Sequence, residues 1–196
     1  MQLLSRTAIK KSLQKTFWVY LTKNFFVTSP DDFTKVEPIL GCKCLPITME
    51  NYHRVRDFRD ESRVSEYRAK LVHREIGFFA EFDGKMVGSI WATVNDAGVP
   101  AVVRTYMRLM PNEALVHDIV TGEEFRGMGM GPFMLGNICA VLLGEFAVNK
   151  IVIDVNVRNR PSLRMMDKAG LQAHQKMLSV SAFGKLVLQK LLRQYR

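Results

Sequence analysis

The stretch Glu123–Pro132, EEFRGMGMGP, carries three glycines at alternate positions. It follows an apolar, β-branched run over residues 114–121 and precedes an apolar run over residues 131–148, so it predicts a glycine-rich turn between a strand and a helix. Glycine lets the backbone approach a ligand closely and adopt positive φ. The N–H groups at a helix N-terminus bind anions, and Arg126 adds a positive charge beside them. The stretch therefore predicts a site for a phosphate or pyrophosphate group.

Two common phosphate-binding motifs do not fit this stretch. A P-loop ends in Gly-Lys-Ser or Gly-Lys-Thr, which does not occur here. A dinucleotide fingerprint needs a third glycine, and Pro132 or Met134 occupies that position, depending on the frame. Five residues separate Thr121 from Gly127, which is too many for the tight first turn of a dinucleotide fold. The expected ligand is therefore a phosphate-bearing molecule of another class.

The spacing R-x-x-G-x-G, formed by Arg126, Gly129 and Gly131, resembles the acetyl-CoA-binding core of the GNAT superfamily of N-acetyltransferases. The sequence downstream agrees, because a β-branched strand leads into Asn156 and Asn159 and then into a further helix. Both halves of the family pattern occur at the right separation. The chain is therefore identified by resemblance as a GNAT-like acyl-CoA-dependent N-acyltransferase.

The resemblance covers residues 114–171 well, residues 42–95 more vaguely and residues 1–40 not at all. It implies an α/β fold with a mixed, mostly antiparallel sheet of about six or seven strands flanked by helices. It also implies that acetyl-CoA is a co-substrate. The reaction it implies is transfer of an acetyl group to a primary amine, by direct attack in a ternary complex.

The order of elements along the chain supports this fold class. Asp83 and Gly84 form a tight-turn dipeptide inside a hairpin that we expect over residues 76–95. Apolar and polar patterns predict the remaining elements as follows: a strand near residues 44–47, polar helices over 49–60 and 62–75, a strand over 150–155, a helix over 161–168, and two closing strands within 172–192.

The first 24 residues predict a helix, because Ile9, Leu13, Phe17 and Leu21 recur every four residues. We interpret residues 1–40 as an accessory helix and linker, and residues 41–196 as the catalytic domain. The apolar stripe needs a surface to cover it. That surface is the domain itself, a second subunit in a homodimer, or an anionic membrane that residues 1–24 contact weakly at its periphery.

The family resemblance assigns the acetyl-CoA contacts. The backbone of Ile119, Val120 and Thr121 would pair with the pantetheine arm as another strand would. The segment from Gly127 to Pro132 would bind the pyrophosphate, through Gly127, Met128, Gly129, Met130, Gly131 and Pro132. Asn159 matches an asparagine that contacts the CoA arm, and Asn156 is a weaker match. For both asparagines the alternative is a turn or a helix cap.

Direct transfer needs a base, because an ammonium group cannot attack a thioester. His117 is the first candidate, since imidazole titrates near physiological pH and strand alternation would place it on the same side as Ile119 and Thr121. It also matches by spacing a functional histidine of the arylalkylamine acetyltransferases, which this segment resembles. Asp118 would enter the site through a β-bulge, and Asp154 lies where some family members carry an acid. A buried core histidine and a hydrogen-bonded acid are the alternatives for the first two.

One position departs from the family pattern. Many members protonate the departing thiolate with a tyrosine in the last helix, and Met166 occupies that position here. Tyr106, Ser162 or water would then supply the proton. The departure also keeps a second function open: a catalytically weak binding module of the same fold, whose basic ends dock on a membrane surface, nucleic acid or a protein.

Composition sets the remaining limits. The 196 residues carry 28 Lys and Arg against 19 Asp and Glu, a net charge of +9. Cys42, Cys44 and Cys139 match neither a disulfide framework nor a metal-ligand spacing, so we expect no metal. Lysines interrupt every apolar run near the start, which predicts a cytoplasmic protein. The acceptor stays open among a small amine, an aminosugar, a polyamine and a protein N-terminus; we do not expect nucleic acid as a partner.

Overall fold

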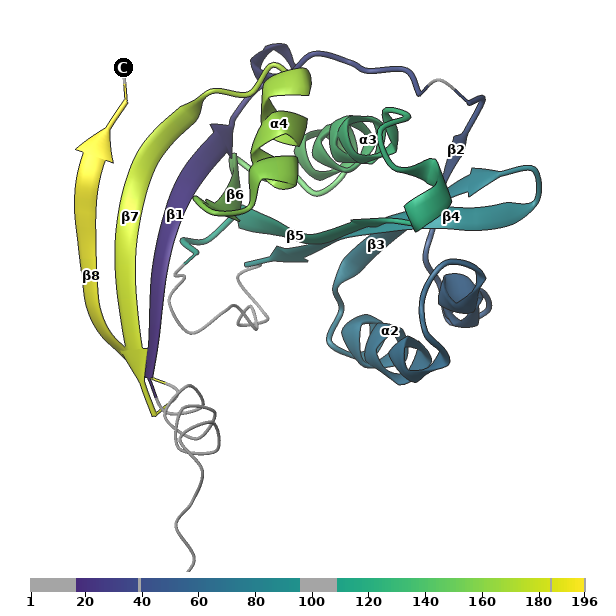
Figure 1. The fold of residues 1–196 in the computed structure, drawn as a ribbon, viewed down its shortest axis with the longest axis horizontal. Helices are drawn as coiled ribbons and strands as arrows, with labels where there is room; N and C mark the ends of the chain where they lie inside the picture. The colour runs from purple at the N-terminus through teal and green to yellow at the C-terminus, as the bar shows by residue number, and fades with distance from the viewer. Residues whose placement is uncertain (1–16, 39, 96–108, 184, 196) are drawn as a thin grey trace, which may run out of the picture.

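The computed structural model describes residues 17–38, 40–95, 109–183 and 185–195, and they form one eight-stranded sheet with helices on both faces (Figure 1). The strand order is β2-β3-β4-β5-β6-β1-β7-β8. The strands are β1 Phe17–Val27, β2 Lys43–Pro46, β3 Ile76–Phe82, β4 Lys85–Val94, β5 Glu113–Thr121, β6 Lys150–Asn156, β7 Ala173–Ala182 and β8 Lys185–Gln194. The helices are α2 Val64–Val72, α3 Met130–Gly144 and α4 Arg160–Lys168.

The first half of the sheet is antiparallel and matches the sequence prediction closely. Strands β3 and β4 form the expected hairpin, with Asp83 and Gly84 at positive φ in its turn. Strand β2 covers the outer edge of β3, and β5 pairs with the other edge of β4. The polar segment expected as a helix over 49–60 is instead a 3₁₀ turn over Tyr52–Asp57, and the helix expected over 62–75 is the shorter α2.

The two faces of this half-sheet carry different cores. Helix α3 packs on one face in a large apolar cluster that includes Ile90, Val116 and Ile138. The 3₁₀ turn and α2 pack on the other face in a smaller cluster built around Tyr67 and Trp91. Figure 1 shows α3 and α4 above the sheet and α2 below it. Each side chain of β4 and β5 therefore faces either the α3 side or the α2 side.

Strands β5 and β6 run parallel and pair only over a short stretch. The paired residues are Glu113–Val116 on β5 and Lys150–Ile153 on β6. Beyond Val116 the two strands have no further pairing with each other in the described chain, while the other edge of β6 continues along β1. The last five residues of β5 are therefore left with an open edge on the β6 side.

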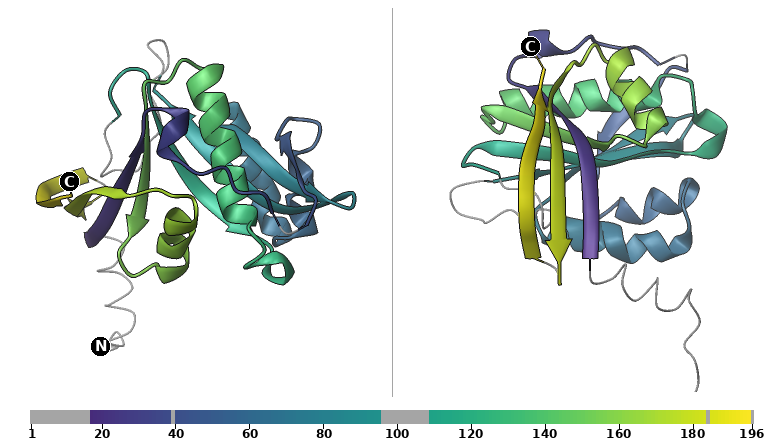
Figure 2. Two further views of the ribbon diagram at one scale, coloured as in Figure 1. Left: turned by 90° about the horizontal axis from the view of Figure 1, so that it is seen from above. Right: turned by 60° about the vertical axis from the view of Figure 1, so that its left-hand side comes forward.

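The predicted N-terminal helix is wrong for residues 17–24, which form most of β1. This strand pairs with β6 on one edge and β7 on the other, so it lies inside the sheet (Figure 2, right). Its run FWVY consists of aromatic and β-branched residues that suit a strand, and pairing along both edges overrides a four-residue spacing of apolar side chains. Ile9 and Leu13, which began that spacing, lie outside the described residues.

Insertion of β1 has two further consequences. It raises the strand number to eight, above the six or seven expected, with the two closing strands β7 and β8 placed beyond it. It also places Phe25 and Val27, which precede residue 41, in the same apolar core as α3. No helix in the described part of the chain is both long enough and apolar enough to span a bilayer.

Candidate functional site

The glycine-rich turn has the geometry that its sequence predicts. Gly127 and Gly129 both adopt φ of 84°, a region that residues with a side chain rarely occupy. Gly129 caps α3, and the first hydrogen bond of that helix runs from the Phe133 N–H to the Gly129 carbonyl. The N–H groups before Phe133 thus precede the helical ladder and are available to an anion. Pro132 has no N–H and cannot donate a hydrogen bond to a pyrophosphate. Its expected contribution is therefore limited to the shape of the first turn of α3.

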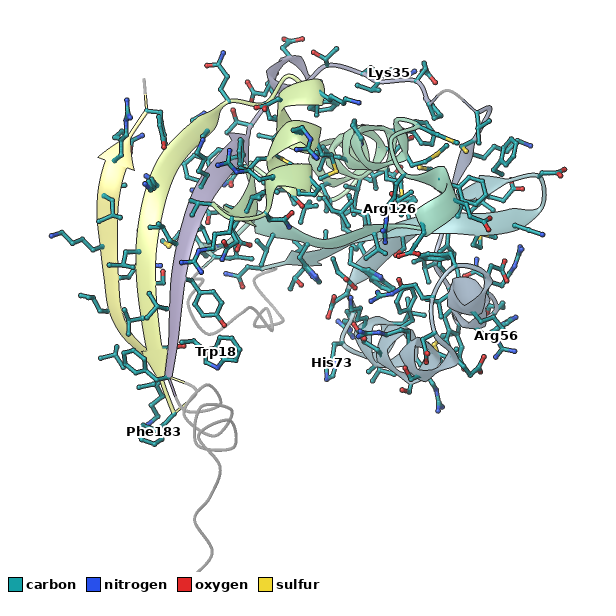
Figure 3. All side chains as sticks on the ribbon, viewed as in Figure 1. Trp18, Lys35, Arg56, His73, Arg126 and Phe183 are labelled. Atoms are coloured by element: carbon teal, nitrogen blue, oxygen red, sulfur yellow. The ribbon has the colours of Figure 1, made fainter. Side chains whose placement is uncertain are left out.

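A cleft of about 420 Å³ opens between this turn, the end of β5 and helix α4. Ile119 and Thr121 of β5 line it, so the open strand edge and the glycine turn belong to one site. The charged residues among its described lining are Arg126, Arg164 and Lys168, all of them positive. Figure 3 labels Arg126 in the segment between β5 and α3. A volume of this size and this charge suit a phosphate-bearing ligand.

Helix α4 contributes more to the cleft than the sequence suggested. Pro161, Ser162 and Met165 line it together with the two basic residues of α4. A Cβ at Gly131 would lie 2.5 Å from the Met165 sulfur, so the absence of a side chain at Gly131 lets α3 and α4 approach each other. The only local signal for these residues was their position on the helix that follows Asn159, which does not by itself indicate which face is exposed.

Several residues assigned to acetyl-CoA by resemblance lie elsewhere. The Asn159 side chain accepts a hydrogen bond of 3.2 Å from the Ser162 N–H and caps α4. The Asn156 side chain accepts one of 2.9 Å from the Arg158 N–H in the preceding turn. Neither asparagine lines the cleft, and neither do Val120 and Met128. The two asparagine side chains thus form a turn and a cap hydrogen bond, and their contact with the CoA arm stays a prediction.

The strand β5 contains a bulge at the point where its edge opens. Trp91 pairs with His117 and Ser89 with Val120, so Ile90 alone faces two residues of β5. Asp118 is the inserted residue, and its φ is 48°. The bulge reverses the alternation, which contradicts the expectation that His117 shares a side with Ile119 and Thr121. His117 faces the α2 side, whereas the other two line the cleft on the α3 side.

Asp118 also faces the α2 side, where it forms ion pairs with two cations. The Lys70 ammonium contacts one carboxylate oxygen directly, and Arg59 Nη1 lies 3.6 Å from the other. Burial of the carboxyl disfavours its ionisation and is the largest single influence, but the charges of Lys70 and Arg59 outweigh it. The pKa of the Asp118 carboxyl therefore lies below its ordinary value. A carboxylate held in its ionised form by two cations is a poor proton acceptor.

His117 lies in a pocket of oxygen atoms on the same face. Its Nε2 lies 3.1 Å from Thr93 Oγ1 and 3.2 Å from Glu75 Oε2. The side chains of His117 and Glu75 are 14% and 12% exposed, so the imidazole is buried but not sealed. Asp154, the third candidate, lies on β6 opposite Asn24 of β1 and does not line the cleft. The structure thus brings His117 and Asp118 together and places Asp154 on another strand.

The thiols do not offer a nucleophile. Burial raises the pKa of the Cys44 and Cys139 thiols to about 12, and it also raises that of Cys42. All three are therefore protonated at neutral pH. Among the described residues, no cluster of three or more His, Cys, Asp or Glu side chains is arranged to hold a metal ion. Met166 is fully buried in the core. Tyr106 lies outside the described residues.

Residues 44–171 match the acetyltransferase (GNAT) family. The chain belongs to this family. Acetyl-CoA-dependent acyl transfer is the general function of GNAT proteins, and amines are their general acceptors. Among curated proteins, no sequence matches this chain.

Solved structures of GNAT proteins share the fold at low sequence identity. A GNAT-family protein from Novosphingobium aromaticivorans DSM 12444 is 13% identical, with a TM-score of 0.57 over 86% of this chain and 66% of its own. A GCN5-related N-acetyltransferase from Kribbella flavida is 11% identical, with a TM-score of 0.56 over 93% and 67%. A GNAT-family acetyltransferase from Colwellia psychrerythraea is 13% identical, with a TM-score of 0.59 over 91% and 62%. This chain thus spans about two thirds of these structures' length, and the likeness supports the fold alone.

Proposed function

We propose that this GNAT protein transfers the acetyl group of acetyl-CoA to a primary amine by direct attack within a ternary complex. The observation that carries the proposal is the continuity of the open edge of β5 with the glycine turn, in a cleft whose charged lining residues are all basic. A pantetheine arm needs unpaired backbone groups along an extended strand. A pyrophosphate needs free N–H groups and positive charge. Both requirements meet in this cleft.

The residues divide between the two parts of the co-substrate. The backbone of Ile119 to Thr121 offers N–H and C=O groups to the pantetheine amides. The N–H groups from Gly127 to Gly131 offer donors to the pyrophosphate, and the α3 dipole adds to their attraction. Arg126, Arg164 and Lys168 would neutralise phosphate charge at the rim. Because Arg126 is largely exposed and pairs with Glu123, we assign it a smaller share than the backbone groups.

The bulge gives the two substrates separate approaches. The cleft lies on the α3 side of β5, whereas His117 and Asp118 face α2. We therefore assign the acceptor amine to the α2 side, where it would meet the thioester through the opening between β5 and β6. Its nitrogen attacks the acetyl carbonyl carbon, the carbon–sulfur bond breaks, and the amine proton passes to His117 directly or through water. Asp118 is less suited to this role because its ion pairs favour its charged form.

The departing thiolate takes up a proton from water, or from the Ser162 hydroxyl while solvent returns a proton to that hydroxyl. Ser162 lines the cleft, whereas Met166 is buried and carries no proton to give. A thiolate is a tolerable leaving group, so the loss of a dedicated acid slows the reaction without abolishing it. The burial of Met166, which leaves no acid at the family's usual position, favours the second candidate, a binding module with weak catalysis.

Two measurements separate the candidates. Titration calorimetry with acetyl-CoA tests the cleft, and a thiol-release assay over a panel of amines tests turnover. The panel contains small alkyl and aryl amines, polyamines, an aminosugar and a peptide with a free N-terminus. Tight binding with release of CoA thiol on one class supports the enzyme and names its acceptor. Binding without turnover on any amine supports the binding module, and absence of binding contradicts both.

A further inference from the structure

Glu75 occupies a defined position between α2 and β3. Helix α2 ends with two nested hydrogen bonds, from the Glu75 N–H to the Lys70 carbonyl and from the Arg74 N–H to the Leu71 carbonyl, each 3.0 Å. Arg74 adopts φ of 59° between them. This arrangement is a Schellman motif, which normally uses glycine at the left-handed position. It fixes the backbone from which the Glu75 side chain reaches β5.

The buried carboxylate oxygen of Glu75 has one close partner that can carry a positive charge. Its Oε2 atom is fully buried and makes no well-aligned hydrogen bond within the described chain. His117 Nε2 lies 3.2 Å from it. A buried carboxylate without compensation costs several kcal/mol, and a neighbouring imidazolium offsets that cost. A positive charge on His117 would therefore compensate this carboxylate.

The ring nitrogen of His117 that faces Glu75 is Nε2, and Thr93 Oγ1 lies 3.1 Å from the same atom. The Thr93 hydroxyl can donate to this nitrogen or accept from it, depending on the tautomer of the ring. In the imidazolium both ring nitrogens carry hydrogen, and its positive charge then faces the Glu75 carboxylate.

The other charged groups around His117 do not replace this carboxylate. Asp118 follows His117 on β5, but Lys70 of α2 and Arg59, which follows the 3₁₀ turn, already neutralise it. Lys70 also lies over the ring of Trp91, 5.0 Å from its centroid. Trp91 is the β4 residue that pairs with His117. Among the described residues, no lysine or arginine forms an ion pair with Glu75. Glu75 is thus the carboxylate that remains available to His117.

We propose that Glu75 is the positioning residue of His117: its carboxylate faces Nε2 and stabilises the imidazolium formed when the acceptor amine loses its proton. The inference rests on the proposed acetyl transfer and names a residue that no motif in the sequence indicated. It assigns to Glu75 an effect on the protonation of His117 and none on acetyl-CoA binding, because the acetyl-CoA cleft lies on the other side of the sheet.

The test compares Glu75→Gln with Glu113→Gln in the full chain. Glu113 is a matched control, since it is a buried carboxylate paired with Lys150 and its contacts do not include His117. Glu75→Gln removes the negative charge that faces the imidazolium, so the acidic limb of the kcat/KM profile should move to lower pH. In Glu75→Gln the plateau of kcat/KM should fall about tenfold. Glu75→Asp should restore part of the plateau and part of the position of the acidic limb, and Glu113→Gln should leave the limb in place.

Proton NMR of the imidazole ring separates this proposal from the proposed function, because it needs no turnover. The chain has four histidines, and loss of one signal in His117→Gln assigns the resonance. The titration midpoint of that signal should fall in Glu75→Gln and not in Glu113→Gln. An unchanged midpoint overturns the pairing. A shifted midpoint with an unmoved kinetic limb overturns the role in catalysis. A wild-type chain that turns over no amine overturns the proposed function, and the catalytic role of Glu75 with it.

Discussion

The cleft on the α3 side of β5 and the polar cluster on its α2 side are built in opposite ways. The cleft consists mainly of backbone: an open strand edge, a turn with two glycines at positive φ and the start of a helix. The cluster consists of partly buried side chains: Glu75, His117, Asp118 and the two cations Lys70 and Arg59 each lie against a group that carries or can carry the opposite charge. The first region suits a ligand recognised by its phosphate and amide groups. The second suits the transfer of a proton.

This difference predicts that mutations on the two sides of β5 change different measured properties. Changes on the cleft side should alter binding of acetyl-CoA, and changes on the α2 side should alter rate, pH dependence or stability with little effect on that binding. A variant that mixes these effects would weaken the contrast between the two sides of β5.

His117→Gln should lower kcat/KM by roughly two to four orders of magnitude, the usual contribution of a general base. Acetyl-CoA affinity should stay within about twofold of wild type, because His117 faces away from the cleft. Steady-state kinetics over pH and calorimetry on the same preparation provide the two readouts. A loss of affinity as large as the loss of rate would place His117 in the co-substrate site instead.

Gly129→Val should weaken acetyl-CoA binding on the order of 100-fold. A β-branched residue at φ of 84° is strained, and its side chain would occupy the approach of the phosphate. Calorimetry measures the loss, and circular dichroism checks that the fold remains. Gly144→Val provides the control, since Gly144 lies at the other end of α3 with open space around its Cα. A small loss in the first variant would argue against a pyrophosphate at this turn.

Asp118→Asn should destabilise the fold by about 3 kcal/mol at neutral pH, because it leaves Arg59 without its counter-charge and Lys70 with only the more distant Glu66 carboxylate. The pKa of Asp118 is lowered in the folded state, so its stabilising effect is full above the ordinary value for aspartate and is lost as pH falls through the folded value. The gap in unfolding free energy between wild type and variant should therefore be constant near pH 7 and shrink below about pH 4. Denaturant unfolding at several pH values measures it, and a gap that widens in acid would contradict the ion pairs.

Arg126→Ala should weaken acetyl-CoA binding only about two- to fivefold, since the side chain is exposed and its charge is screened. The loss should shrink further as salt is added. If this variant lost as much affinity as Gly129→Val, charge rather than backbone geometry would dominate the cleft, and the contrast between the two sides of β5 would fail.

The two regions also differ in how far the sequence predicted them. The glycine turn, the strand before it and the helix after it are consecutive, so a local pattern specifies them. The α2-side cluster joins residues 59, 70, 75, 93, 117 and 118, which come together only through the sheet, and no spacing in the sequence links Glu75 to His117. A bulge at Asp118 was expected as the way for this carboxylate to enter the site, and the structure has a bulge there. Its effect on the side to which His117 points was missed, because the alternation of a regular strand was assumed for that residue.

The misprediction of β1 has a related cause. Phe17 and Leu21 fit a helical stripe, but the run from Phe17 to Tyr20 is also rich in strand-forming residues. Period alone could not decide between the two structures, because the deciding interaction is pairing with β6 and β7. Both of those strands lie more than a hundred residues later in the chain. Tertiary pairing therefore determined the element where local propensity was divided.

A crystal structure of the chain with CoA tests the central claim most directly. We expect the pyrophosphate within hydrogen-bond distance of N–H groups between Gly127 and Gly131, and the pantetheine arm along Ile119 to Thr121. We expect the thiol to end at the Asp118 bulge, with His117 on the opposite side of the strand. A CoA molecule bound outside this cleft, or a thiol directed away from β5, would contradict the account.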